Sequence, residues 1–169
     1  PGWTSFPVAW ADFDERTPIL TEISPYVSLG KGCTGWHVGA GFVVTASHCV
    51  TPLGDRTFLK IVLSNEQTLK GANIAFLANN EANMDDFAVL KIGIPKRVDW
   101  AYLDLSCSVP PVRTEVTVTG FPAVNMGALT TNWGHVSTKL VDGFDGGHWL
   151  HGIGLDLTAS GGYSGSPVQ

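Results

Sequence analysis

Short apolar runs, rich in β-branched and aromatic residues, alternate along the chain with clusters of Gly, Pro, Asn and Asp. Four of these runs predict strands, at residues 41–46 (GFVVTA), 57–63 (TFLKIVL), 87–92 (FAVLKI) and 115–121 (EVTVTGF). No window carries an apolar stripe of helical period over three turns, and a parallel sheet would need crossover helices between its strands. The pattern therefore predicts an all-β protein built as a barrel or a sandwich.

The composition excludes several classes of function. The chain has 169 residues, 44% of them hydrophobic, which is enough for a substantial core. Its formal net charge is −5 and its ten Lys and Arg residues are scattered, so we expect no nucleic-acid partner. No apolar run reaches the length of about 18 residues that a membrane-spanning helix needs, so we expect no membrane span in this segment.

A serine in a glycine-rich turn is the first candidate for chemistry. Ser164 lies in GGYSGSPV (161–168), but a serine hydroxyl attacks a carbonyl only when a base takes its proton and donors stabilise the oxyanion. His48 follows the apolar run VVTA, and Asp86 stands directly before FAVLKI. Each residue alone has an ordinary interpretation, as a half-buried histidine bonded to backbone groups or as an aspartate at a strand end. Together, the order His, Asp, Ser is one of the known chain orders of a catalytic triad.

Three sequence blocks resemble the signatures of chymotrypsin-like serine proteases. They are VVTASHC (43–49), DDFAVLKI (85–92) and GGYSGSPV (161–168), and they occur in the order and at the approximate spacing of that family. The stretch LDLTASGGYSGSPV is similar to the nucleophile block of bacterial glutamyl endopeptidases, and GFP (120–122) followed by WGHVS (133–137) resembles HtrA-like and glutamyl enzymes. The block also has a tyrosine, Tyr163, directly before the serine, and in this it resembles viral polyprotein proteases of the sobemovirus type. The resemblance covers the chain from about residue 30 to its end.

The resemblance implies an all-β fold of two six-stranded antiparallel β-barrels of the chymotrypsin type, with the active site in the cleft between them. Residues 1–108 would comprise an N-terminal extension and the first barrel, and residues 109–169, which begin with VPPV, the second barrel. Members of the family continue for at least two strands past the nucleophile. We therefore expect the second barrel to be incomplete at Gln169 and the biological protein to continue by roughly 20–40 residues.

Carried over by position, the resemblance assigns the catalytic roles. Ser164 is the nucleophile, His48 the general base and then acid, and Asp86 the carboxylate that orients the histidine. Asp85 is the neighbour that the family pattern passes over. The backbone N–H groups of Gly162 and Ser164 would form the oxyanion hole. The floor of the specificity pocket would consist of small, neutral residues, which do not favour cleavage after Lys or Arg: Thr158, Ala159 and Ser160.

The cysteines bear on the cellular compartment. Cys33 and Cys49 match the spacing of the disulfide that braces the histidine loop in cellular members of the family, whereas Cys107 has no obvious partner. A bridge would suit a secreted enzyme, and a viral protease of the host cytoplasm would keep all three thiols reduced. Both locations therefore stay open.

The sequence thus predicts a serine endopeptidase that acts on a polypeptide substrate without a metal or an organic cofactor. His135, His148 and His151 lack a zinc-like spacing with Cys or carboxylate ligands. Two biological roles stay open, namely processing of its own viral polyprotein and action as a secreted microbial enzyme. The alternative from a different class is a protease-fold binding module without catalytic activity. Tyr163 stands where trypsin-like members have the aspartate that pairs with a new N-terminus, so activation by that ion pair is not expected.

Overall fold

The structure is a computed structural model that describes residues 9–10, 23–30, 32–50, 60–63, 68–70, 72–78, 85–93, 99–125, 127–145 and 148–169. Within these ranges the regular structure is all β, apart from two one-turn 3-10 helices at Ser47–Cys49 and Ala123–Asn125. The predicted all-β class is therefore confirmed. No helix within these ranges is long and apolar enough to cross a membrane.

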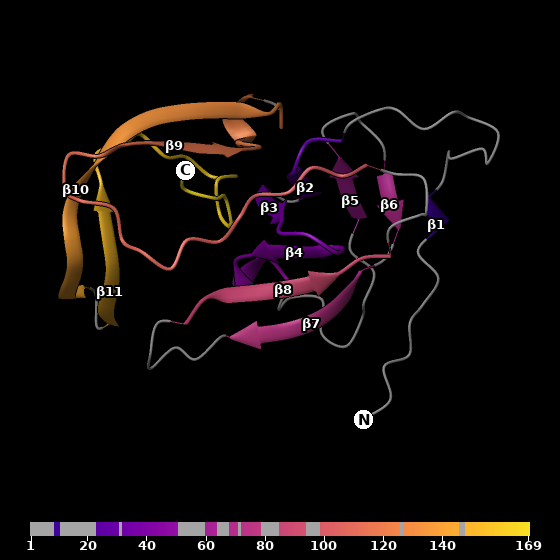
Figure 1. Cartoon of the computed structure of the whole chain (residues 1–169), viewed down its shortest axis with the longest axis horizontal. Coiled ribbons are helices and arrows are strands. Elements are labelled where there is room, and N and C mark those ends of the chain that lie inside the picture. The colour runs from indigo at the N-terminus through magenta and orange to yellow at the C-terminus, as the bar shows by residue number, and fades with distance from the viewer. Residues whose placement is uncertain are drawn as a thin grey trace.

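The strands form two sheets, which stand at the right and the left of Figure 1. The first holds β1 (Ala9–Trp10), β2 (Tyr26–Gly30), β3 (Cys33–His37), β4 (Phe42–Thr45), β5 (Lys60–Leu63), β6 (Thr68–Lys70), β7 (Asn73–Ala78) and β8 (Phe87–Lys91). The second holds β9 (Glu115–Gly120), β10 (Thr130–Asp145) and β11 (His148–Leu155). The strand orders are β1-β6-β5-β2-β3-β4-β8-β7 and β11-β10-β9, and all the neighbours are antiparallel.

The four predicted strands correspond to β4, β5, β8 and β9, although residues 57–59 of the second run lie outside the described residues. β8 illustrates how the apolar pattern of the sequence predicts a strand. Ala88 and Leu90 are fully buried, whereas Phe87 between the turn and Ala88 is exposed. Successive side chains of a strand point to opposite faces, so this alternation marks one face as core and the other as outer surface.

The strands of the described residues form open sheets, so the expected pair of six-stranded barrels is not individually confirmed. The described strands give open orders of eight and of three strands. On the edge of β9 that faces away from β10, the described residues form one isolated antiparallel bridge, between Val118 and Val168. Three strands are too few to curl into a closed barrel, because closure links strand number to tilt and stagger.

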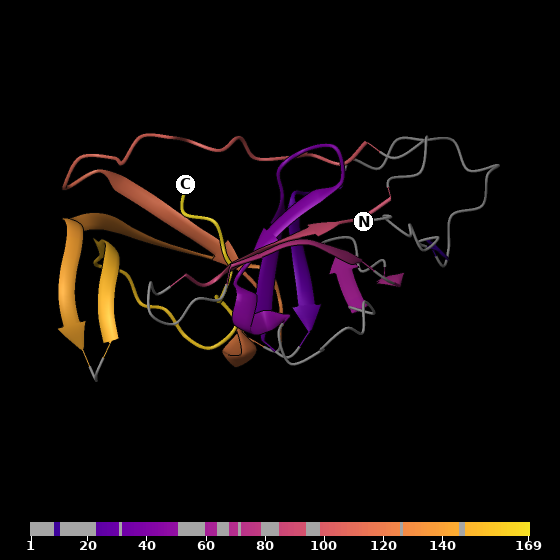
Figure 2. The same ribbon diagram turned by 90° about the horizontal axis from the view of Figure 1, so that it is seen from below.

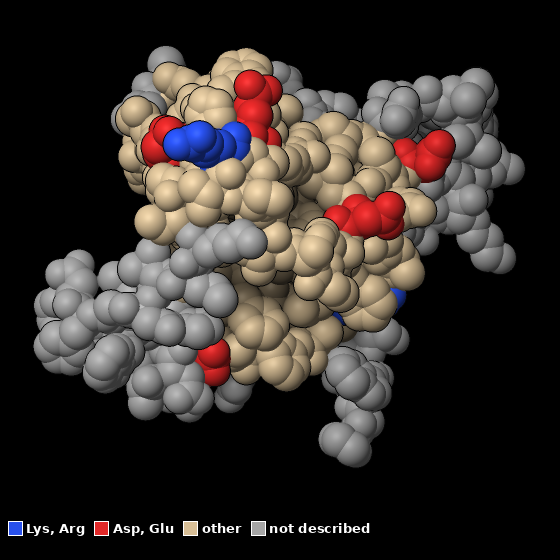
Figure 3. All heavy atoms as spheres, turned by 60° about the vertical axis from the view of Figure 1, so that its left-hand side comes forward, with Lys and Arg blue, Asp and Glu red and all other residues tan. Residues whose placement is uncertain are grey.

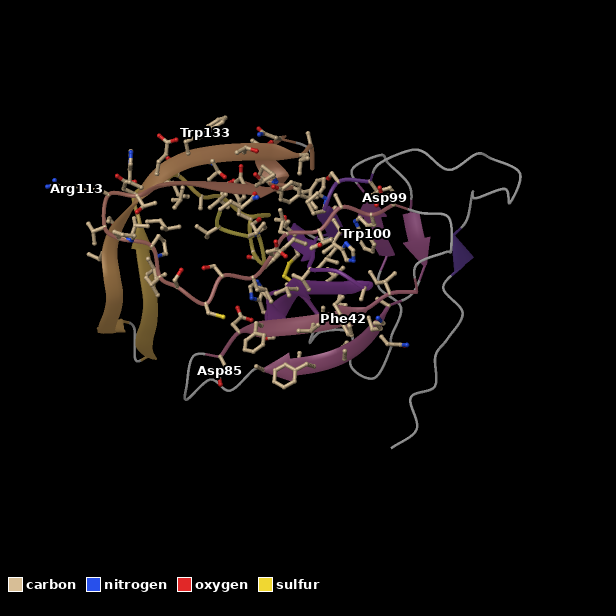
Figure 4. All side chains as sticks on the ribbon, in the orientation of Figure 1. Phe42, Asp85, Asp99, Trp100, Arg113 and Trp133 are labelled. Atoms are coloured by element: carbon tan, nitrogen blue, oxygen red, sulfur yellow. A yellow bond between two sulfur atoms is a disulfide. The ribbon has the colours of Figure 1, made fainter. Side chains whose placement is uncertain are left out.

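The main core lies inside the first sheet. Trp100 is 4% exposed, its indole N–H donates to the carbonyl of Ser24 at 3.0 Å, and a parallel bridge joins it to Ile23. Figure 4 shows Trp100 at this inner position, among the side chains of the first sheet. The residues that pack together are apolar and buried: Ile23, Val27, Leu29, Val43, Val50, Ala88, Leu90, Ile92 and Trp100.

Two segments connect the sheets. Residues 101–112 run along one side of the molecule from the first sheet to the second, as Figure 2 shows. The C-terminal segment passes between the sheets (Figure 1), where Thr117 and Gln169 exchange two backbone hydrogen bonds of 2.8 and 2.9 Å. On the face drawn in Figure 3, most of the surface of the described residues is uncharged, and a basic side chain at the upper left lies between acidic ones.

Candidate active site

The candidate base and its carboxylate come from two adjacent strands. His48 lies in the 3-10 turn that follows β4, and Asp86 stands directly before β8. β4 and β8 are antiparallel neighbours with Thr45 opposite Ala88, so residues just past the end of β4 lie beside those just before β8. Strand register therefore brings His48 to Asp86, although 38 positions separate them in the sequence.

The carboxylate of Asp86 accepts three hydrogen bonds. The Ser47 hydroxyl at 2.7 Å and the backbone N–H of His48 at 2.9 Å donate to Oδ1, and Nδ1 of His48 lies 2.6 Å from Oδ2. Burial by itself would raise the pKa of Asp86, but the hydrogen bonds from Ser47 and His48 outweigh it and lower the pKa below its usual value. Asp86 is therefore ionised at neutral pH.

This pairing fixes the tautomer of the histidine. An ionised carboxylate only accepts hydrogen bonds, so Nδ1 of His48 carries the proton that it shares with Asp86, and Nε2 keeps a free lone pair. The side chain of His48 is 56% exposed, so Nε2 is accessible to a substrate or a hydroxyl. Asp85 does not join the pair: it is exposed, and in Figure 4 its side chain points outward from the start of β8.

The candidate nucleophile, Ser164, is anchored to β3. It forms a parallel bridge with Cys33, and the backbone N–H of Thr34 donates to its carbonyl at 2.8 Å. A disulfide joins Cys33 to Cys49, the residue after His48, with the two Cα atoms 6.0 Å apart. This bridge, the yellow bond in Figure 4, links the strand that holds Ser164 to the turn that holds His48.

The disulfide also lies against the histidine ring. The two sulfur atoms and one ring nitrogen of His48 all lie within 4.8 Å of one another. Because the sulfurs are bonded together, they offer no thiolate pair to a metal ion. Among the described residues the Ser164 hydroxyl makes no hydrogen bond. In unliganded enzymes the bond between nucleophile and base is often long, and it tightens when substrate binds.

Gly162 has a backbone conformation that requires glycine. Its φ is +111°, and a Cβ there would lie 2.5 Å from the carbonyl oxygen of Phe121 and from Cα of Pro122. The preceding carbonyl, of Gly161, accepts a hydrogen bond of 2.8 Å from the N–H of Ala123. In a trans peptide the N–H points opposite to the C=O, so the N–H of Gly162 faces away from Ala123.

The second candidate oxyanion donor is fixed in a similar way. The carbonyl of Tyr163 accepts a hydrogen bond of 2.9 Å from the N–H of Ser166, which sets the orientation of the peptide that carries the N–H of Ser164. Within the described part of the chain, the N–H of Gly162 donates no hydrogen bond, so it is available to an anionic oxygen.

The three expected pocket residues lie just before this turn. Thr158 and Ala159 are exposed and Ser160 is half-buried, and the carbonyl of Thr158 accepts a hydrogen bond of 2.6 Å from the side-chain amide of Asn132 on β10. None of the three lines the cavity of about 640 Å³ between residues 103–110 and the second sheet. Their part in substrate selection stays a prediction.

Tyr163 is an interior residue of the nucleophile turn. It is 8% exposed, its hydroxyl lies 3.5 Å from the carbonyl of Thr130, and burial raises its pKa. A Cβ on Gly120 would lie 3.2 Å from its ring, so the tyrosine packs directly against β9. The ring therefore fills this interior position of the turn with apolar surface.

The histidines outside the pair with Asp86 form no cluster in the described residues. Nδ1 of His135 lies 3.6 Å from Oδ1 of Asp156, and the backbone N–H of His135 donates to the same oxygen. Both side chains are about half exposed, at 53% and 54%, so this is a solvated surface contact. The side chains of His148 and His151 lie outside the described residues.

Sequence reasoning missed two polar residues of the site, Ser47 and Thr34. The Ser47 hydroxyl is one of the three donors to Asp86. The Thr34 hydroxyl bonds to the carbonyl of Gly162, 128 positions away in the sequence. Only their places in the sequence could have pointed to these two residues, since Ser47 directly precedes His48 and Thr34 directly follows Cys33.

A family model described as a trypsin-like peptidase domain matches residues 33–169, which include all the candidate catalytic residues and both bridged cysteines. No curated protein matches the chain in sequence.

Many solved structures share the fold, among them the following three. The Rv3671c protease in an inactive form has a TM-score of 0.63 and 18% identity, over 85% of this chain and 69% of that chain. An inactive serine-to-alanine mutant of Rv3671c from M. tuberculosis H37Rv has a TM-score of 0.61 and 17% identity, over 85% and 66% of the two chains. The apo MamO protease domain from Magnetospirillum magneticum has a TM-score of 0.63 and 18% identity, over 85% and 77%. At these identities the likeness concerns the fold alone.

Proposed function

Because the chain belongs to the trypsin-like peptidase domain family, we propose that it is a serine endopeptidase in which Ser164 is the nucleophile, His48 the base and Asp86 the orienting carboxylate. The observation that carries the proposal is the double attachment of His48 to Asp86, through its backbone N–H and through Nδ1 at 2.6 Å. An aspartate whose only role was at the end of a strand would not be expected to bond to the imidazole ring of His48 as well. Here the ring is held with Nε2 free, as a general base requires.

In the first half of the reaction, Oγ of Ser164 attacks the carbonyl carbon of the scissile peptide while Nε2 of His48 takes its proton. The negative charge that develops on the carbonyl oxygen is stabilised by the N–H groups of Gly162 and Ser164, and Asp86 stabilises the imidazolium. The C–N bond then breaks, the leaving amine takes the proton from Nε2, and the acyl group remains as an ester on Ser164.

In the second half, water attacks the ester carbon while Nε2 of His48 takes one of its protons. The bond to Oγ of Ser164 breaks, and the proton on Nε2 passes to that oxygen as the acid product leaves. The enzyme returns to its starting state without a net gain or loss of protons.

The two halves of the site come from the two parts of the chain that the sequence distinguishes. We assign His48 and Asp86 to the unit 1–108 and Ser164 to the unit 109–169. The separation into two open sheets, joined by residues 101–112, supports this division.

The substrate class of the family is a polypeptide. For the compartment we propose an oxidising one, because the Cys33–Cys49 disulfide would be reduced in a cytosol. This favours a secreted enzyme over a cytoplasmic processing protease. Nothing in the described residues favours action on its own polyprotein.

Hydrolysis of an unfolded protein such as casein tests the proposal. The wild-type chain is expected to cleave it, and Ser164→Ala and His48→Ala are each expected to lose on the order of 10⁴-fold or more in kcat, because the triad acts as a unit. Far-UV circular dichroism checks that both variants remain folded. A binding module would bind the substrate without cleaving it, and a variant with near wild-type turnover would refute the assignment of that residue.

A further inference from the structure

A buried threonine hydroxyl joins the nucleophile turn to the end of β9. Thr34 is 0% exposed, and its Oγ1 donates to the carbonyl of Gly162 at 2.7 Å and accepts the N–H of Phe121 at 2.9 Å. A carbonyl only accepts and an N–H only donates, so the one hydroxyl proton points to Gly162 and a lone pair faces Phe121. The connection therefore depends on this hydroxyl and on two backbone groups.

The hydroxyl holds the middle peptide of the turn. The carbonyl of Gly162 and the N–H of Tyr163 belong to one peptide plane, which lies between the two peptides that carry the candidate oxyanion donors. The N–H of Tyr163 bonds to the carbonyl of Ser160 at 3.3 Å, so the 2.7 Å bond from Thr34 is the shorter of the two that fix this plane. A rotation of the middle peptide would change ψ of Gly162 and φ of Tyr163, the dihedral angles that set its orientation relative to the two donor peptides.

The same residue bonds the turn a second time. The backbone N–H of Thr34 donates to the carbonyl of Ser164 at 2.8 Å, so Thr34 is hydrogen-bonded to the turn at both Gly162 and Ser164. The carbonyl of Thr34 in turn accepts the hydroxyl of Thr45 at 2.8 Å, which ties the residue to β4. Thr34 is therefore a rigid point from which the turn can be oriented.

We propose that Thr34 is a positioning residue whose hydroxyl aims the N–H groups of Gly162 and Ser164 at the oxyanion. The inference rests on the proposed function, because it concerns how that reaction is stabilised. Loss of the hydroxyl would leave a buried N–H and a buried carbonyl unpaired, and would free a peptide next to a glycine, the residue with the widest conformational range. A misplacement of about 1 Å in a catalytic group can cost on the order of 100-fold in rate.

The test compares two substitutions of Thr34. Thr34→Val keeps the shape of the side chain and removes the hydroxyl, and Thr34→Ser keeps the hydroxyl. Thr119→Val is the matched control, because Thr119 is 5% exposed and its hydroxyl bonds to that of Thr131 at 2.9 Å, between β9 and β10. The probe is p-nitrophenyl acetate, a small ester that acylates a reactive serine without a need to know the cleavage specificity. For each variant, the dependence of the burst rate on ester concentration gives the maximal acylation rate and Ks, and the thermal midpoint is measured separately.

Thr34→Val is expected to slow acylation roughly 10- to 100-fold while Ks, the dissociation constant of the ester before acylation, changes by less than about twofold, because the donors act in the transition state. Thr34→Ser should keep most of the rate. Thr119→Val should lower the thermal midpoint about as much as Thr34→Val and leave the rate almost unchanged. Acylation at the wild-type rate in Thr34→Val, or an equal loss in Thr119→Val, overturns the inference.

A wild-type chain that gives neither a burst nor steady hydrolysis of the ester overturns the proposed function instead, and with it the catalytic role of Thr34. Amide hydrogen exchange, followed by NMR, then still tests the contact itself. The N–H of Phe121 should exchange faster in Thr34→Val than in the wild type, and should be unchanged in Thr119→Val. Equal protection of Phe121 in all three proteins would show that the hydroxyl does not hold this peptide.

Discussion

The backbone N–H and the imidazole of His48 bond to different oxygens of the same carboxylate, that of Asp86, at 2.9 and 2.6 Å. Two attachments restrain the ring more than one, because the imidazole cannot rotate without breaking the bond from Nδ1. Ser47, which directly precedes His48, adds a third bond and keeps the carboxylate in place. The pair is thus assembled locally, from one turn and the start of one strand.

Replacement of Asp86 by asparagine should disable the histidine while preserving the shape of the site. The amide can donate to Nδ1, which would shift the ring proton to Nε2 and remove the free lone pair. We expect kcat to fall about 10⁴-fold, somewhat less than on loss of Ser164 or His48. Asp85→Asn is the control, because Asp85 is exposed and makes no contact with the ring in the described residues. Equal losses in the two variants would contradict the assignment of Asp86.

Two adjacent glycines should respond very differently to alanine. In Gly162→Ala the new Cβ would lie 2.5 Å from backbone atoms of Phe121 and Pro122, at a φ of +111°. Strain of this kind costs roughly 1–3 kcal/mol, and relief by rotation would misdirect the oxyanion donor at a cost on the order of 100-fold in kcat. A Cβ on Gly161 would meet nothing within 4 Å. Thermal melts and ester hydrolysis should therefore show a large loss for Gly162→Ala alone, and similar behaviour of the two variants would argue against the described turn.

Removal of the disulfide should loosen the link between the base and the nucleophile. Cys33 and Cys49 are 16 positions apart, and a bridge over a loop of this length contributes roughly 3 kcal/mol in the chain-entropy model. The Cys33→Ala, Cys49→Ala double variant should lose about this much free energy of unfolding in urea titrations. Mass spectrometry after alkylation without reductant should find Cys107, which is exposed, modified and the other two protected. Three modified cysteines in the native protein would rule the bridge out.

Acid should destabilise the fold through a buried histidine outside the active site. His37 is 2% exposed, stacks on Trp100 with ring centroids 4.0 Å apart, accepts the N–H of Gly41 at Nε2 and bonds to the carbonyl of Ala101 at Nδ1. Burial lowers its pKa below the usual 6.5, and the positive charge of Lys91 lowers it further, against an opposing effect of the backbone hydrogen bonds. A proton on Nε2 would also break the bond to Gly41.

The sign of the effect follows from proton uptake. The unfolded chain takes up this proton near pH 6.5, whereas the folded chain takes it up only at lower pH, so the unfolded state binds more protons just below pH 6.5. Stability should therefore be full above pH 6.5 and fall as the pH decreases toward the folded-state pKa. His37→Gln should flatten this part of the curve in urea titrations between pH 7.5 and 5. An unchanged slope would show that another group is responsible.

The strands and the candidate triad were predictable because their signals are local. The alternation around Ala88 and Leu90 marks a strand, and His48 and Asp86 each lie next to such a strand. The open sheets were not predictable in the same way, since the order of strands depends on contacts between distant segments. The bond from Thr34 to Gly162 spans 128 positions, and a threonine that follows a cysteine carries no local mark of such a partner. The specificity pocket at Thr158, Ala159 and Ser160 stays a prediction.

The most direct measurement is covalent labelling with a fluorophosphonate, followed by peptide mapping. The reagent reacts with a serine whose proton is taken by a base, so it reports on the cooperation of Ser164 with His48 rather than on any particular substrate. We predict a single adduct on Ser164 in the wild-type protein, and no adduct in Ser164→Ala or His48→Ala variants that remain folded. A folded wild-type protein that stays unlabelled, or an adduct on another residue, would contradict the proposed function.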